Sequence, residues 1–126
     1  MKYMTFAQKR LTRWNEVVNF ILTSSDEEFK NNLSNYFDIS SLIDYHLFGL
    51  SMCGLDSYGK NQIFMTYDGI KWIASMYDMD STWGLYWNGE TMVPYDYSRD
   101  KFEDKIQDRQ GNLLFERLEN NFYNEL

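Results

Sequence analysis

The chain has 126 residues, of which 44% are hydrophobic and 18% aromatic, and its formal net charge is −7. This length and apolar content predict a single globular domain or domain fragment over residues 1–126 and exclude a disordered chain. The acidic charge argues against non-specific nucleic-acid binding, and the absence of a long apolar stretch or a signal-peptide core argues against a membrane span and favours a cytoplasmic location.

The N-terminal segment predicts an amphipathic helix from about Thr5 to Leu22. Its apolar residues recur at helical spacing, at Leu11, Trp14, Val18 and Ile21, and Phe6, Val17 and Leu22 widen the stripe. The only cluster of basic residues in the chain, Lys9, Arg10 and Arg13, falls on the same segment. We interpret that cluster as one solvated helix face, with a phosphate contact as the less favoured alternative.

Two capping signals predict two further helices. Ser25 and Glu28 have the spacing of a capping box, which opens a helix that carries Phe29, Leu33 and Phe37. Asp38 is placed to cap a third helix from Ile39 to about Met52. The apolar positions of this third helix, which should form its buried face, are Ile39, Leu42, Ile43, Leu47 and Leu50.

The middle of the chain predicts a β-hairpin. The segments Gln62–Tyr67 and Lys71–Tyr77 are rich in aromatic and β-branched residues, and the turn-forming pair Asp68-Gly69 separates them. An irregular aromatic stretch follows, and apolar residues at helical spacing predict a last helix from Leu113 to Tyr123. The fold class is therefore α+β and helix-dominated, with helices around a β-hairpin.

Acidic and carboxamide side chains flank this hairpin on both sides. Asp56 and Asn61 precede the first predicted strand, and Asp78 and Asp80 follow the second. Hard oxygen ligands of this kind suit Mg²⁺ or Mn²⁺. The two close carboxylates, Asp78 and Asp80, would repel each other unless a cation lay between them or one were protonated. We therefore predict a metal site for phosphate chemistry, whereas the alternative reading makes each residue a turn or cap residue.

The spacing Asp56-x4-Asn61 matches the catalytic loop of protein kinases, in which the Asp orients the acceptor hydroxyl and the Asn holds a metal ion. The His-Arg pair that usually precedes this Asp is absent, and Gly54-Leu55 stands in its place. A calcium-binding EF-hand starting at Asp78 is excluded, because its sixth and twelfth positions would be Trp83 and Gly89.

Two stretches, YFDISSLIDYHLFG and LDSYGKNQIFMTYDGIKWIASMYDMDSTWG, resemble the kinase-like family of spore coat protein H (CotH). The features that carry the resemblance are Lys60-Asn61, Trp72 in the second strand, and the motif Asp-x-Asp-x-Thr-x-Gly over 78–84. The resemblance implies an atypical protein kinase C-lobe that transfers the γ-phosphoryl group of ATP to Ser of a protein substrate. It implies that Asp56 is catalytic, that Asn61 and Asp78 bind the metal ion, and that Asp80 supports or shares that role.

The family domain is longer than this chain and has an N-terminal lobe that supplies an ATP-covering loop and a phosphate-binding Lys. No Gly-rich phosphate loop precedes Asp56. We therefore expect a C-lobe-like portion with little activity alone, whose partner is a protein substrate or the missing lobe. The alternative is a non-catalytic remnant that binds a partner or a sugar through the aromatic loop 83–97, and the competing interpretation of that loop is that its rings cover the core. The oligomeric state is left open.

Overall fold

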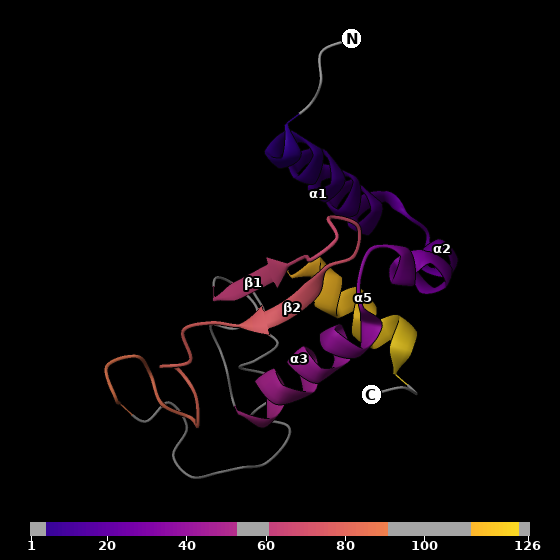
Figure 1. Cartoon of the computed structure of the whole chain (residues 1–126). Helices are drawn as coiled ribbons and strands as arrows, with labels where there is room; N and C mark the ends of the chain where they lie inside the picture. The colour runs from indigo at the N-terminus through magenta and orange to yellow at the C-terminus, as the bar shows by residue number, and fades with distance from the viewer. Residues whose placement is uncertain (1–4, 53–60, 91–111, 124–126) are drawn as a thin grey trace.

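The computed structural model describes residues 5–52, 61–90 and 112–123. In chain order its elements are α1 (Phe6–Thr23), α2 (Asp26–Asn32), the short 3₁₀ helix η1 (Leu33–Asn35), α3 (Ile39–Ser51), β1 (Gln62–Met65), β2 (Ile73–Met76) and α5 (Leu113–Phe122). Figure 1 shows the hairpin of β1 and β2 among the helices. Helix α3 packs along β2, and α5 packs against α2 and α1. The predicted α+β, helix-dominated class is confirmed.

Side-chain caps fix the starts of α1, α2 and α3. At α1 the Thr5 hydroxyl accepts from the Gln8 N–H at 3.3 Å, and the Gln8 side chain accepts from the Thr5 N–H at 2.8 Å. The predicted capping box of Ser25 and Glu28 is present at α2, and its hydrogen bonds from the Ser25 N–H and hydroxyl hold the pKa of Glu28 below its ordinary value. Asp38 caps α3 as predicted, because its Oδ1 accepts from the Ser41 N–H at 3.1 Å.

The hairpin forms where it was predicted, with shorter strands and a longer connection. Its antiparallel register pairs Gln62 with Met76 and Met65 with Ile73. Asp68 organises the connection, because its Oδ1 accepts from the N–H groups of Ile70 and Lys71 at 2.7 and 3.0 Å. These two donors, that of Ile70 first, hold the pKa of the Asp68 carboxyl below its ordinary value.

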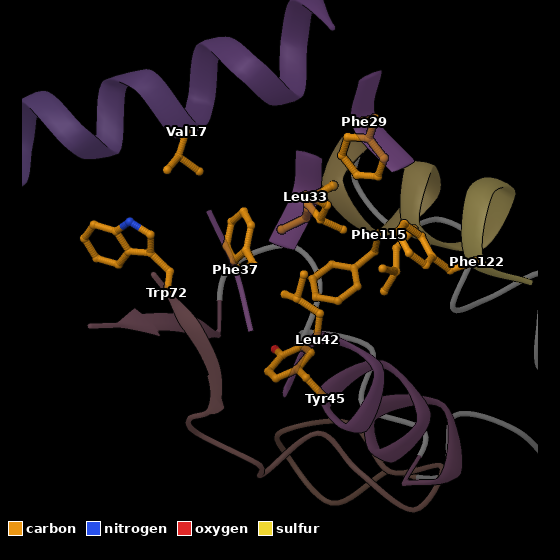
Figure 2. Close-up of a cluster of buried hydrophobic side chains, with 11 residues drawn as sticks. Val17, Phe29, Leu33, Phe37, Leu42, Tyr45, Trp72, Phe115 and Phe122 are labelled. Carbon is orange, nitrogen blue, oxygen red and sulfur yellow. The ribbon is translucent and has the colours of Figure 1, made fainter. Parts of the chain in front are cut away.

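One core of aromatic and aliphatic side chains joins the helices to the hairpin (Figure 2). Its buried members are Val17, Phe29, Leu33, Phe37, Leu42, Tyr45, Trp72, Leu114, Phe115, Leu118 and Phe122. The predicted apolar stripe of α1 was partly wrong. Val17 is fully buried, as its place in the stripe predicted, whereas Leu11 and Leu22 are 62% and 64% exposed. The face that α1 buries is centred on Trp14 and Val17, since the Trp14 ring lies edge-on to the Trp72 ring at 4.7 Å.

Phe37 does not continue the second helix as predicted. The main chain on either side of it pairs with Trp72 in a parallel bridge. The Trp72 N–H donates to Tyr36 O at 2.8 Å, and the Asp38 N–H donates to Trp72 O at 2.9 Å. The Phe37 N–H still donates to Leu33 O at 2.9 Å, as in a helix, but the Tyr36 carbonyl and the Asp38 N–H bond to Trp72 instead, which places the start of α3 beside the start of β2.

The buried face of α3 also differs from the predicted one. Leu42 is buried as expected, but Leu47 is 38% exposed, and the polar residues Tyr45 and His46 lie in the interior. The His46 ring stacks on Phe115 of α5, and its Nε2 lies 2.9 Å from a carboxylate oxygen of Glu119. The single histidine of the chain therefore joins α3 to α5.

Two arginines tie the helices together through main-chain carbonyl groups. Arg117 of α5 is 8% exposed and donates to the carbonyl oxygens of Ile21, Ser24 and Ser25 at 2.8–2.9 Å. Arg13 of α1, predicted to lie on a solvated face, instead donates to Ile70 O and Asn35 O, and its guanidinium lies over the Tyr36 ring.

Within the part of the chain that the structure describes, no helix has both the length and the apolar character needed to cross a bilayer.

Candidate metal centre at the open end of the hairpin

The antiparallel register brings two of the predicted ligands together. Asn61 immediately precedes β1, and Asp78 follows β2 by two residues, so both lie at the end of the hairpin opposite the turn. The Asn61 side chain donates from Nδ2 to the main-chain oxygen of Asp78 at 3.1 Å. One hydrogen bond therefore joins the segment that enters the hairpin to the segment that leaves it.

This hydrogen bond also orients the Asn61 side chain. A main-chain carbonyl oxygen can only accept a hydrogen bond, so the atom of Asn61 that faces Asp78 O is the amide nitrogen. The other amide atom, Oδ1, is the hard oxygen that a cation such as Mg²⁺ would bind. Neither Asn61 Oδ1 nor the Asp78 carboxylate takes part in this hydrogen bond.

The segment after β2 folds into a tight loop with its hydroxyl groups inside and its carboxylates outside. Ser81 and Thr82 are 5% and 8% exposed, whereas Asp78 and Asp80 are exposed. Asp78 has a left-handed backbone conformation with a φ of 53°, which Asp and Asn tolerate better than most residues. Ser81 and Thr82 therefore pack inside this loop, and the two acidic side chains face solvent.

One predicted site residue falls outside the part of the chain that the structure describes, and the others do not form a complete ligand set. Asp56 lies outside the described residues, so its position relative to Asn61 and Asp78 stays a prediction. Within residues 5–52, 61–90 and 112–123, three or more Asp, Glu, His or Cys side chains nowhere gather closely enough to hold a metal ion. The residue types at Asn61, Asp78 and Asp80 fit a divalent cation, and a complete ligand set would need groups beyond these three.

Two surface grooves lie away from these residues. A groove of about 410 Å³ runs between α3 and β2, and its lining includes Tyr45, Phe48 and Met76. A second, of about 600 Å³, lies between α1 and the α2–η1 segment, and its lining includes Glu16, Phe20 and Glu28. Neither of these two grooves is lined by Asn61, Asp78 or Asp80.

The family model described as CotH kinase protein matches residues 3–125. The chain belongs to the CotH kinase family. The match confirms the resemblance drawn from the sequence and extends it beyond the stretch from Tyr36 to Gly84 to almost all of the chain. No curated protein and no solved structure gives a significant match.

In this CotH-family chain, two consecutive tight turns follow the acidic loop. Trp83 and Gly84 have φ angles of 58° and 75°, and the Leu85 N–H donates to Thr82 O at 3.0 Å, as in a type I′ turn. In the next turn the Gly89 N–H donates to Tyr86 O, and the Tyr86 N–H donates to Glu90 O, both at 2.8 Å. The backbone of this segment is therefore fixed by hydrogen bonds.

Each turn carries a tryptophan whose ring faces solvent. The Trp83 and Trp87 side chains are 67% and 73% exposed, and Tyr86 between them is 44% exposed. The sequence marked this loop as aromatic and left open whether the rings cover the core. Over residues 83–90 the structure shows that these three rings do not, while residues 91–97 lie outside the described ranges.

Proposed function

We propose that this chain carries the metal-binding end of a phosphoryl-transfer site that moves the γ-phosphoryl group of ATP to a Ser hydroxyl of a protein. Membership of the CotH kinase family supports a kinase-like chemistry. The observation that carries the proposal is the hydrogen bond from Asn61 to Asp78 O, which joins two predicted metal ligands at one end of the hairpin.

In this proposal each residue has a defined task. Asn61 Oδ1 and the carboxylates of Asp78 and Asp80 hold Mg²⁺ or Mn²⁺, and the ion neutralises charge on the phosphate groups. Asp56 orients the acceptor hydroxyl and accepts its proton. The exposed carboxylates would repel a nucleoside triphosphate, and a bound cation would offset that repulsion. The rest of the nucleotide would be held by groups that the family's N-terminal lobe supplies.

Metal binding is expected to stabilise the folded chain without nucleotide. A cation at ten times its dissociation constant adds about 1.4 kcal/mol to the free energy of unfolding, which corresponds to a rise in Tm of about 5 °C for a chain of this size. Melting curves with and without MgCl₂ or MnCl₂, at constant ionic strength set with KCl, measure this rise. An unchanged Tm at millimolar Mn²⁺ would contradict the proposed metal site.

A second candidate function is binding through the exposed aromatic turns. The supporting observation is that Trp83 and Trp87 project from turns with fixed backbones and bury little of their surface. Residues 77–90 contain Asp78, Asp80 and Glu90 and no Lys or Arg, so the surface disfavours anionic partners. A neutral oligosaccharide or a protein surface without net negative charge fits it better.

This second function predicts a loss of binding without a loss of stability. Trp87→Ala should abolish binding of neutral oligosaccharides or uncharged peptides, measured by isothermal titration, and should change the free energy of unfolding by less than about 0.5 kcal/mol. Tyr67→Ala is the matched control, because Tyr67 is 89% exposed at the opposite end of the hairpin. Binding that survives Trp87→Ala, or that requires Mn²⁺, would count against this function.

A further inference from the structure

We propose that the Thr82 hydroxyl is a positioning group that sets the directions of the Asp78 and Asp80 carboxylates. This inference rests on the proposed metal-binding function. Thr82 would not contact the cation itself but would orient the two aspartates that bind it. Thr82 is 8% exposed, whereas both aspartates are exposed. Its hydroxyl donates to Met79 O at 2.9 Å, so it acts on the backbone between the two aspartates.

Side chains hold two successive carbonyl groups of this backbone. Asp78 O accepts from Asn61 Nδ2 at 3.1 Å, and Met79 O accepts from Thr82 Oγ1 at 2.9 Å. These carbonyls belong to the two peptide planes on either side of Met79. Because each peptide unit is planar, the two hydrogen bonds together restrain the backbone rotations between Asp78 and Asp80, and therefore the relative directions of their Cα–Cβ bonds.

Thr82 is itself anchored to the helical part of the molecule. Its carbonyl oxygen accepts from the Leu85 N–H at 3.0 Å, which closes the first aromatic turn. The next residue, Trp83, donates its N–H to Met52 O at the C-terminal cap of α3, at 2.6 Å. The restraint on Met79 O is therefore transmitted from α3 through Thr82, whereas the restraint on Asp78 O comes from the start of β1 through Asn61.

Loss of the hydroxyl should weaken cation binding without removing a ligand. Groups that orient metal ligands through hydrogen bonds typically contribute about 10-fold to 100-fold in metal affinity, because a ligand that is free to rotate must be ordered on binding. We expect Thr82→Val, which keeps the shape of the side chain and removes the donor, to raise the Mn²⁺ dissociation constant about tenfold.

The test is a Mn²⁺ titration of the full chain in which free Mn²⁺ is followed by electron paramagnetic resonance. Thr82→Ser and Thr82→Ala form a second, independent pair, because both lack the methyl group and differ only in the hydroxyl. Thr82→Ser should keep the wild-type Mn²⁺ affinity within about twofold. Thr82→Ala should raise the Mn²⁺ dissociation constant about tenfold, as expected for Thr82→Val. In the absence of metal, the amide ¹⁵N chemical shifts of Asp80 and Ser81 should differ from those of the wild-type chain more in the Val and Ala variants than in the Ser variant.

A matched control uses the same substitution at the closed end of the hairpin. The Thr66 hydroxyl donates to Asp68 Oδ1 at 3.2 Å and accepts from the Gly69 N–H at 2.9 Å. Thr66→Val should therefore lower the stability of the hairpin and leave the Mn²⁺ dissociation constant unchanged.

The outcomes separate this inference from the proposed function. If the wild-type chain binds no Mn²⁺, the metal-binding function is wrong and the role of Thr82 falls with it. If the wild-type chain binds Mn²⁺ and the Val and Ala variants bind equally well, the metal site stands and only the positioning role is overturned. Equal losses in the Ser and Ala variants would also overturn it, because the hydroxyl would then have no part in the effect.

Discussion

Replacement of Arg117 by Ala should lower the free energy of unfolding by about 3 kcal/mol, as expected when a buried charge and its hydrogen bonds are removed together. The guanidinium group bridges α5 and the corner between α1 and α2. It donates to three main-chain oxygens and to the side chains of Ser24 and Asp26, at 2.8–3.1 Å. It also lies over the Phe29 ring, 4.2 Å from the ring centroid. Urea denaturation followed by circular dichroism measures the loss.

Two further substitutions of Arg117, to Lys and to Met, show which property of this side chain matters. Arg117→Lys keeps the charge but not the planar arrangement of donors, so it should still lose about 2 kcal/mol. Lys71→Ala, at an exposed residue of the hairpin connection, is the control and should change stability by less than about 0.5 kcal/mol. If Arg117→Met were as stable as the wild-type chain, the apolar part of the side chain would account for the stabilisation. The hydrogen bonds of the guanidinium group would then make no net contribution to the free energy of unfolding.

Replacement of Asp78 by Asn should abolish the rise in Tm that Mg²⁺ or Mn²⁺ produces. The substitution removes a negative charge from the proposed metal centre, and we expect about a 100-fold loss of affinity, equivalent to about 2.7 kcal/mol. It is a mild change for the fold. Asn adopts the left-handed conformation found at residue 78 at least as readily as Asp, and the main-chain oxygen that accepts from Asn61 is retained. The Tm without metal should therefore stay unchanged.

Asp44→Asn is the matched control for this experiment, since it makes the same change at an exposed carboxylate on α3. It should keep the full metal-dependent rise in Tm. Asp80→Asn tests whether Asp80 shares the ion, in which case it should lose affinity to a similar degree. A rise in Tm that persists in Asp78→Asn would place the cation elsewhere on the chain. Within a longer protein that phosphorylates a substrate, Asp78→Asn should lower kcat and leave expression and folding intact.

Local signals in the sequence predicted most of the secondary structure. The capping residues Ser25 and Asp38 mark helix starts because their side chains reach only to the next turn of the chain. The turn at Asp68-Gly69 is local in the same sense, since the side-chain hydrogen bonds of Thr66 and Asp68 fall within residues 66–71. These features depend on neighbours in the sequence, so periodicity and residue type were enough to find them.

The errors concern contacts between distant segments. Spacing placed both Val17 and Leu11 on the apolar stripe of α1, but it could not show that Val17 is buried and Leu11 exposed, because this depends on where Trp72 packs. Phe37 was placed in a helix, but its neighbours bond to a residue 35 positions further along the chain. Arg117 was not recognised as buried, since its acceptors lie more than 90 residues away.

The same division holds for the candidate site. The sequence by itself determined the chemistry available at the hairpin ends, namely the carboxamide of Asn61 and the carboxylates of Asp78 and Asp80, and it pointed to the CotH kinase family that the family model confirms. Only the tertiary structure decided that Asn61 donates to Asp78 O and that Thr82 is buried and bonded to Met79 O. Residue type fixes which atoms can donate or bind a cation, but strand register and packing fix where those atoms point.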